Sequence, residues 1–309
     1  MLDYAALRVL AAVVRTGSFE RAAAALSLTP SAISQRVRNL EERMGAVLVE
    51  RGTPCMATEK GAWLCRHIDH VAMLERDLMA HLPSIAGEIG STGRVTLQVA
   101  TNADSLDTWF IEAVADFARG SGDLVEIALD DEEHTAEWLR RGRVLAAVTS
   151  LERPVQGCRV TRLGALRYLA TASPDFMARH FPRGVDRDAV CLAPALTFNR
   201  KDRLQLQWIT CTFAAEIACP SHFLPSTRGF VDACLAGMGW ALNPASLVAP
   251  HLASGRLVEL VPGTPFDRPL FWQQSRLGSP LLGELSVAVF AAARHHLVQQ
   301  AVSGRQVRN

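Results

Sequence analysis

The sequence predicts an α/β protein that begins with an all-α winged helix-turn-helix and continues through one long helix into a larger domain. Three observations lead to this prediction. Capping residues and glycines divide the first 57 residues into short helices, heptad-spaced apolar residues follow, and strands alternate with helices after residue 93. With 309 residues, 49% of them hydrophobic and 20% charged, the chain is long and apolar enough for a small and a larger folded domain.

The N-terminal segment contains two helices on either side of a tight turn. An apolar helix ends before Gly17, and Ser18 is placed to cap a short alanine-rich helix. Thr29 as N-cap, with Pro30 at the first helical position, starts a further helix that runs to about Met44. Helical hairpins also occur in proteins that do not bind nucleic acid. Two short helices joined by such a turn, with polar and basic residues on the second, are nevertheless typical of a helix-turn-helix that binds the major groove of double-stranded DNA.

A predicted wing strengthens the DNA-binding interpretation. Residues 47–49 form a short apolar strand, residues 50–54 form a turn, and a return segment reaches Thr58, which caps the next helix. Arg51 lies near the tip of this wing, where it would meet a phosphate or the minor groove. The candidate DNA-binding residues are Ser18, Ser31, Ser34, Gln35, Arg36, Arg38 and Arg51.

The segment 58–92 is expected to be a linker helix followed by a hinge. Six positions in it follow alternating spacings of four and three, as in a coiled-coil seam, and only Glu75 among them is not apolar: Leu64, Ile68, Val71, Glu75, Leu78 and Leu82. The seam residues expected to make the contact are Leu64, Ile68, Val71 and Leu78. The seam could pack on its own chain. Pairing with a second copy is favoured, because a two-fold dimer places two reading heads on a pseudo-palindromic site. These four residues are therefore predicted to mediate a homodimer or homotetramer.

Beyond residue 93, strands alternate with helices. We expect a helix over residues 105–119, strands over residues 124–129 and 216–219, and a helix near residues 174–181. Such repeated units predict open, mostly parallel sheets with helices on both faces. Ligands of such sheets bind beyond the carboxyl ends of the strands. Asn102 and Ser105 follow the first strand and open a helix, whose N-terminus favours a carboxylate, although Ser105 could also serve only as a cap. An acidic run that includes Asp131 follows the second strand, where it could be a solvated loop or could meet a cation.

Carboxylate donors in one place and acids in others predict a zwitterionic ligand with an additional positive charge. Asn102 and Ser105 would hold its α-carboxylate, while Asp131, with Asp202 as a second candidate, would hold its cationic side chain. The candidate effector-binding residues are Asn102, Ser105, Thr108, Asp131, Thr149, Asn199, Asp202 and Thr227.

Composition and missing motifs exclude other classes. A net charge of +1 is too small for a non-specific nucleic-acid coat, and seven cysteines without framework spacing indicate a reducing compartment. His67 and His70 lack a second ligand pair, so no metal is expected. No catalytic or dinucleotide motif is present, so we expect no enzyme, no catalytic residue and no cofactor. Without a signal-like N-terminus or a membrane-length apolar run, the protein is expected to be cytoplasmic, with no membrane partner.

Three motifs resemble the signature of LysR-type transcriptional regulators: Ser18-Phe19-Glu20-Arg21-Ala22-Ala23, residues 31–41 and Thr58-Glu59-Lys60-Gly61. Pro30 departs from the pattern, because many members carry glutamine there as a base or backbone contact. The resemblance implies a two-lobed effector domain like a periplasmic binding protein, with RNA polymerase as a further candidate partner. The implied domains are residues 1–57 (DNA-binding), 58–92 (linker), 93–302 (effector-binding, with lobe I 93–163 and 268–302 and lobe II 164–267) and 303–309 (tail).

A narrower resemblance connects the chain to the ArgP/LysG branch of that family. It is carried by Asn102-Ala103-Asp104-Ser105 with Thr108-Trp109, Leu139-Arg140-Arg141-Gly142, residues 163–169 and Gly255-Arg256-Leu257. Members of this branch sense lysine and arginine and activate a basic amino-acid exporter, which implies the same for this chain. The alternatives are a LysR-type regulator that senses a different amino acid or an organic acid, and a constitutive DNA-binding or replication-origin protein.

Overall fold

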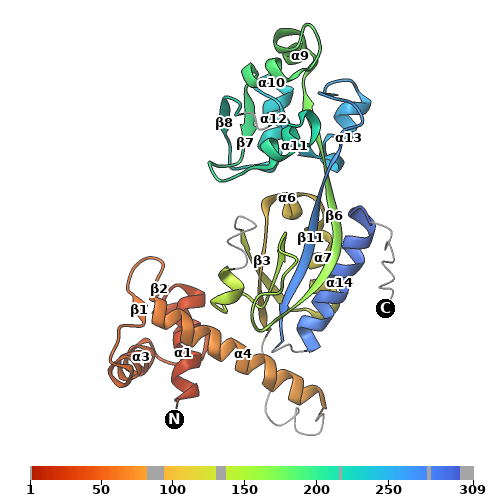
Figure 1. Cartoon of the computed structure of the whole chain (residues 1–309). Coiled ribbons are helices and arrows are strands. Elements are labelled where there is room, and N and C mark those ends of the chain that lie inside the picture. Colours follow the sequence, from red (N-terminus) through yellow and green to blue (C-terminus); the bar gives the residue numbers. More distant parts are fainter. Residues whose placement is uncertain (1, 82–93, 130–136, 216–217, 277–279, 300–309) are drawn as a thin grey trace. The chain divides into compact units, whose positions relative to one another are not determined.

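The computed structural model describes residues 2–81, 94–129, 137–215, 218–276 and 280–299. The chain forms two compact units, and the boundary between them lies between Thr96 and Leu97, so that the long helix α4 belongs to the N-terminal unit (Figure 1). Each unit has a hydrophobic core of its own. None of the described helices is both long and apolar enough to cross a membrane.

The N-terminal unit has the predicted winged helix-turn-helix form. Its elements are α1 (Tyr4–Thr16), α2 (Phe19–Ala25), α3 (Pro30–Met44), β1 (Val49–Glu50), β2 (Met56–Ala57) and α4 (Glu59–His81). The side chains of Ser18 and Thr29 accept hydrogen bonds from first-turn N–H groups of α2 and α3, as predicted. Gly17 ends α1 in the left-handed region at φ 66°, and β1 pairs antiparallel with β2 to form the wing.

Helix α4 packs against the core of its own unit. Ile68 is 4% exposed within the cluster formed by α1, α2 and α3, and Leu64 and Val71 pack against the same cluster. Gly61 permits the contact with the wing, because a Cβ there would lie 2.0 Å from the carbonyl oxygen of Leu48. At these three positions the heptad-spaced residues therefore pack within the chain. This corrects the prediction that they contact a second copy.

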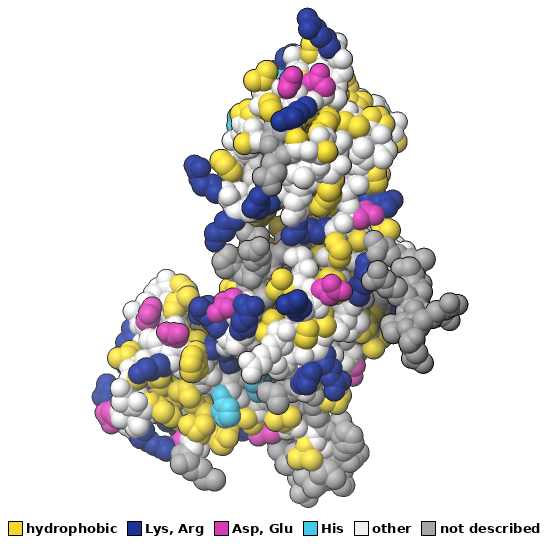
Figure 2. All heavy atoms as spheres, viewed as in Figure 1, with side chains coloured by type: hydrophobic (Ala, Val, Ile, Leu, Met, Phe, Trp, Pro, Cys, Tyr) yellow, Lys and Arg dark blue, Asp and Glu magenta, His cyan; other side chains and the backbone are white. Residues whose placement is uncertain are grey.

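The exposed side of α4 carries other apolar residues. Trp63, Leu74 and the predicted seam residue Leu78 are 63%, 62% and 53% exposed. Hydrophobic side chains, yellow in Figure 2, are visible on the surface of this unit. If α4 pairs with a second copy, this exposed face is the one available for it.

The second unit contains the two-lobed domain. Its helical elements are α6 (Ala103–Ser105), η1 (Leu106–Phe110), α7 (Ile111–Ser121), α9 (Pro174–His180), α10 (Arg187–Leu192), α11 (Leu204–Phe213), α12 (Thr227–Leu235), α13 (Ala245–Ala253) and α14 (Pro280–His296). Its strands are β3 (Thr96–Thr101), β4 (Leu124–Leu129), β5 (Ala146–Thr149), β6 (Cys158–Ala172), β7 (Ala195–Thr197), β8 (Ser221–Phe223), β9 (Ala241–Pro244), β10 (Val258–Glu259) and β11 (Phe266–Ser275).

Two long strands connect the lobes. β6 and β11 run side by side from the lobe that contains β3 and α7 to the lobe that contains β7 and α12 (Figure 1). They pair antiparallel from Cys158↔Ser275 to Tyr168↔Phe266, and the Arg167 guanidinium binds the Asp267 carboxylate across the pair at 2.7 and 2.8 Å. These strands are the inter-lobe crossings that the family resemblance implied.

The sheet differs from the mostly parallel one that we predicted. Its order is β10-β6-β11-β5-β3-β4, with β9 also paired to β6. Strands β5, β6, β9, β10 and β11 form antiparallel pairs, whereas β3–β5 and β7–β8 are parallel. The cause is the crossing itself, because a strand that leaves one lobe and a strand that returns beside it must run in opposite directions.

Several predicted elements agree closely with the structure and others do not. The strand predicted over residues 124–129 and the helix predicted near residues 174–181 correspond to β4 and α9. The helix predicted over residues 105–119 is divided by the π-helical segment η1, and α10 and α13 were not predicted. The strand predicted at residues 216–219 falls partly outside the described residues, and β8 begins at Ser221.

Candidate effector site and DNA-binding surface

Helix α3 presents a polar surface opposite its buried side. Ser31, Gln35 and Arg38, spaced by four and three, share the exposed face, while Ile33 is fully buried. The side-chain amide of Gln35 donates to Asn39 Oδ1 at 2.7 Å. Asn39 was not among the predicted DNA-binding residues, although its position four residues after Gln35 could have identified it. The arrangement offers amides, a hydroxyl and a guanidinium to a DNA groove.

The remaining predicted DNA-binding residues differ in their exposure and in the residues that they contact. The Ser18 hydroxyl caps α2, with Glu20 N at 3.2 Å, and donates to the Glu20 carboxylate at 2.6 Å, which lowers the pKa of that carboxyl. Arg36 is exposed and lines a small hollow with Asp3 and with Asn39, the hydrogen-bond partner of Gln35. Ser34 is half-buried. Arg51 is exposed on the wing, and its guanidinium carbon lies 5.3 Å from the centre of the Phe19 ring.

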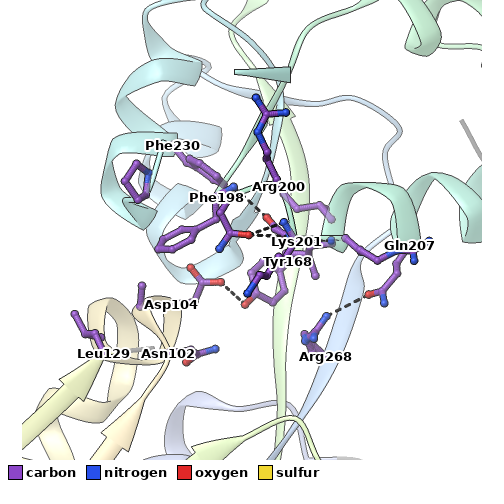
Figure 3. A pocket seen from close by; sticks show the side chains of 17 residues that line it. Asn102, Asp104, Leu129, Tyr168, Phe198, Arg200, Lys201, Gln207, Phe230 and Arg268 are labelled. Carbon is purple, nitrogen blue, oxygen red and sulfur yellow. Dashed lines mark hydrogen bonds between the residues drawn. The ribbon is translucent and has the colours of Figure 1, made fainter. Parts of the chain in front are cut away.

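A cavity of about 690 Å³ lies in the two-lobed domain (Figure 3). Its walls come from lobe I, from lobe II and from the crossing strands β6 and β11. The lining residues are Asn102, Ala103, Asp104, Leu129, Tyr168, Phe198, Asn199, Arg200, Lys201, Asp202, Arg203, Leu204, Gln207, Pro225, Phe230, Leu242 and Arg268. Its volume lies within the range of typical small-molecule sites.

A carboxylate at the cavity, Asp104, receives hydrogen bonds from two hydroxyls. Tyr168 Oη donates to Asp104 Oδ2 at 2.6 Å, and Thr227 Oγ1 donates to Asp104 Oδ1 at 2.6 Å. Both donors are 1% exposed. Both donors are neutral hydroxyls, and each bonds a different oxygen, so the two bonds orient the carboxylate. Asp104 was quoted in the motif but was not predicted as a site residue.

Local structure fixes the position of Asp104. Asn102 caps α6 by accepting a hydrogen bond from Ser105 N at 3.0 Å, and Thr108 Oγ1 donates to the carbonyl oxygen of Asp104 at 2.6 Å. The π-helical segment η1 follows at once, as is common near functional sites. Asn102 lines the cavity as predicted, whereas Ser105 is fully buried and Thr108 is bonded to its own helix, so neither lines it.

The predicted acids of the cavity also differ in role. Asp202 Oδ2 accepts from Phe198 N at 3.1 Å and Asp202 Oδ1 accepts from Leu204 N at 2.9 Å. Asn199 Oδ1 accepts hydrogen bonds from Lys201 N at 2.7 Å and from Asp202 N at 3.0 Å. The side chains of Asn199 and Asp202 therefore both shape the loop that lines the cavity. Asp131 lies outside the described residues.

Two further predicted residues are structural in their contacts. Thr149 is fully buried at the end of β5, where its hydroxyl accepts from Leu151 N at 3.3 Å and from the Gln273 amide at 3.4 Å. It does not line the cavity. Thr227 is the first residue of α12, and its contact is with Asp104. Among the residues that the structure describes, no group of His, Cys, Asp and Glu side chains is placed to hold a metal ion.

The cavity brings charges of both signs together. Four basic side chains line it, Arg200, Lys201, Arg203 and Arg268, beside the carboxylates of Asp104 and Asp202. Figure 3 shows the Asp104–Tyr168 bond and a second lining bond, in which Arg268 Nη1 donates to Gln207 Oε1 at 3.2 Å. A ligand that carries both a carboxylate and a cationic group would find partners for each.

A winged helix-turn-helix and a two-lobed domain with a polar cavity define a DNA-binding protein that responds to a small molecule. Residues 4–62 match the family described as bacterial regulatory helix-turn-helix protein, lysR family, and residues 90–294 match the LysR substrate binding domain. The chain therefore belongs to the LysR family of transcriptional regulators. It is a regulator and not an enzyme, as the sequence predicted.

Three similar proteins show where the chain lies within the family. It is 43% identical to the HTH-type transcriptional regulator ArgP of Pseudomonas aeruginosa, over 98% of this chain and 99% of that protein. It is 40% identical to the lysine export transcriptional regulatory protein LysG of Corynebacterium efficiens, over 93% and 97%. The full-length LysG of Corynebacterium glutamicum, solved with bound effector Arg, covers 96% of this chain and all of its own at 37% identity and a TM-score of 0.64. The resemblance to the ArgP/LysG branch is confirmed.

Proposed function

We propose that this regulator binds lysine or arginine in the inter-lobe cavity and controls a gene for the export of basic amino acids. The observation that carries the proposal is the Asp104 carboxylate, which lines the cavity and is oriented by two neutral hydroxyl donors. Such a group pairs well with an ammonium or guanidinium. A similar LysG protein holds arginine as its effector, and a similar regulator is named for lysine export.

We assign the ligand's cationic side chain to Asp104 and its α-carboxylate to the basic side of the lining. Arg268 and Lys201 both line the cavity and provide the charge for the carboxylate. Asn102 lies beside Asp104 and can contribute its amide. This arrangement moves the main acidic role from Asp131 and Asp202 to Asp104, and it removes Ser105 from direct contact with the ligand.

On the DNA side, the exposed face of α3 is assigned to the major groove, with Gln35 for base contact and Arg38 for phosphate contact. Two copies of the chain would place two such helices on a pseudo-palindromic site. Binding of the effector then changes the relative populations of the arrangements in which the reading heads engage DNA. The size of that change is limited by the difference in the effector's affinity for those arrangements.

An organic acid is the second candidate effector, because four basic side chains line the cavity and the carboxylate of Asp202 is directed to backbone N–H groups. A dicarboxylate would use the basic side chains and would avoid Asp104.

Calorimetric titration of the full-length protein distinguishes these ligands. We expect lysine and arginine to bind at least about 100-fold more tightly than norleucine and citrulline, which lack the charged side-chain group, and more tightly than glutarate. Asp104→Asn should weaken lysine binding by about 100-fold or more while keeping the size and shape of the side chain. Equal binding of norleucine and lysine, or tighter binding of glutarate, would disprove the assignment.

The matched control is Asp116→Asn. Asp116 lies on α7, undergoes the same change of charge, pairs with Arg119 on its own helix and does not line the cavity. We expect it to change lysine affinity far less than Asp104→Asn does.

A further inference from the structure

We propose that Asp104, Tyr168 and Thr227 form a latch that ties lobe I to lobe II, and that the effector binds selectively to the latched state. The latch is inferred from hydrogen bonds within the chain. The statement about the effector rests on the proposed function, because it takes a ligand cation as the partner of Asp104. The two statements are tested by separate measurements.

The first tie joins residues far apart in the sequence. Asp104 belongs to α6 of lobe I, and Thr227, 123 residues later, is the first residue of α12 in lobe II. Tyr168 stands on β6, one of the two strands that cross between the lobes, and binds the other oxygen of the same carboxylate. One carboxylate therefore contacts lobe II and a crossing strand at once.

A second tie lies one residue further along α12. Arg228 Nη2 donates to the carbonyl oxygen of Asp107 at 3.4 Å, and Arg228 Nε lies 3.8 Å from Asp107 Oδ1. The Arg228 side chain is 69% exposed, so this tie is weaker than the buried one. Successive residues at the start of α12 thus meet the segment of α6 and η1 at two points.

The start of α12 is held rigidly for this role. The Ser226 hydroxyl accepts a hydrogen bond from Gly229 N at 3.0 Å, which caps the helix and fixes the positions of the two residues that make the ties.

The same carboxylate connects the latch to the ligand. The two hydroxyls bond different oxygens of Asp104, and the proposed function assigns the ligand cation to this same carboxylate. Separation of the lobes would remove Thr227 from Asp104 and would change both the orientation and the surroundings of the group that receives the ligand cation. A cationic ligand therefore binds the latched state more tightly and increases its population.

Thr227→Val tests the latch because it removes the hydroxyl and keeps the shape and every charge. Without effector, we expect faster hydrogen exchange in both tied segments, residues 105–110 and 229–235, measured by mass spectrometry on the full-length protein. Thr210→Val is the matched control, because Thr210 is an exposed residue of α11 whose hydroxyl bonds only its own helix at 2.8 Å. It should leave exchange in both segments unchanged.

The ligand part of the proposal is tested by calorimetry with lysine at several NaCl concentrations. Thr227→Val should weaken lysine binding by about tenfold, the usual effect of one hydrogen bond to a charged group. It should leave the salt dependence of the affinity unchanged, because the charge of Asp104 remains. Asp104→Asn should reduce both the affinity and its dependence on salt.

Each outcome is decisive. Unchanged exchange in residues 105–110 upon Thr227→Val would overturn the latch, whatever the ligand. Wild-type lysine affinity in a variant with faster exchange would overturn the coupling between latch and effector. A salt dependence altered as in Asp104→Asn would show that Thr227 acts on the ligand directly. If the wild type binds neither lysine nor arginine, the proposed function fails, and the exchange measurement without effector still decides the latch.

Discussion

In the N-terminal unit, the polar side chains of the reading surface bond to residues two to four positions away, as Ser18 does to Glu20 and Gln35 does to Asn39. In the effector unit, the Asp104 carboxylate bonds to residues 64 and 123 positions away. These two contacts of the DNA-binding surface therefore lie within or at the start of a single helix, whereas the effector cavity requires both lobes to be folded and correctly placed. Substitutions in the first should act independently, and substitutions in the second should be coupled.

The two sides of α4 provide the strongest test of this contrast. Ile68→Asp places an unpaired charge in the core of the N-terminal unit, so we expect a loss of about 3–5 kcal/mol of unfolding free energy and loss of DNA binding. Leu74→Asp, on the exposed side of the same helix, should leave the fold intact and shift the protein toward monomers, as measured by light scattering. If Leu74→Asp keeps the wild-type mass, the exposed face of α4 is not the pairing face.

A second large effect is expected at Gly61. Gly61→Ala forces a Cβ against the carbonyl of Leu48 and should destabilise the N-terminal unit by about 3 kcal/mol, seen in thermal unfolding. Effector affinity should not change, because the cavity lies in the other unit. Gly120→Ala is the matched control, since this glycine of α7 has no atom within 4 Å of the added Cβ. A fall in effector affinity upon Gly61→Ala would contradict the independence of the two units.

Smaller effects are expected on the α3 surface. Gln35→Ala should reduce discrimination between operator and altered base pairs by about 1–3 kcal/mol if the amide contacts a base edge. Arg38→Ala should weaken binding to all sequences alike and reduce the slope of log affinity against log salt by about one unit. Fluorescence anisotropy with operator and random duplexes at several salt concentrations measures both. Additive effects in the double variant would support the local character of this surface.

The smallest effects concern two thiols, one in each unit. Burial, with the Asp69 charge, raises the pKa of Cys65 to about 12, and burial raises the pKa of Cys234 to about 12. The unfolded chain releases these protons near pH 8.5, so the folded state loses stability as the pH rises from about 9 toward 12. At pH 8 both thiols should react slowly with iodoacetamide until their own unit unfolds. Simultaneous labelling of both across a denaturant series would show one unfolding transition instead of two.

The same contrast explains what the sequence could and could not predict. The caps at Ser18 and Thr29 act within a few positions, so they gave the correct starts of α2 and α3. Asp104 was missed because its donors become neighbours only after the lobes fold. The role of Ile68 was misassigned because a heptad looks the same whether it packs on its own chain or on a second copy.

The adjacency of β6 and β11 also has a consequence for how new sensors arise. The chain enters lobe II along one of these strands and returns along its hydrogen-bonded neighbour, so lobe II is an insertion whose two ends lie together. Insertions of this kind can be exchanged with little disturbance to the host domain. Replacing the segment between Gly164 and Asp267 with its counterpart from a related regulator should therefore produce chimaeras with altered ligand preference and an unchanged operator.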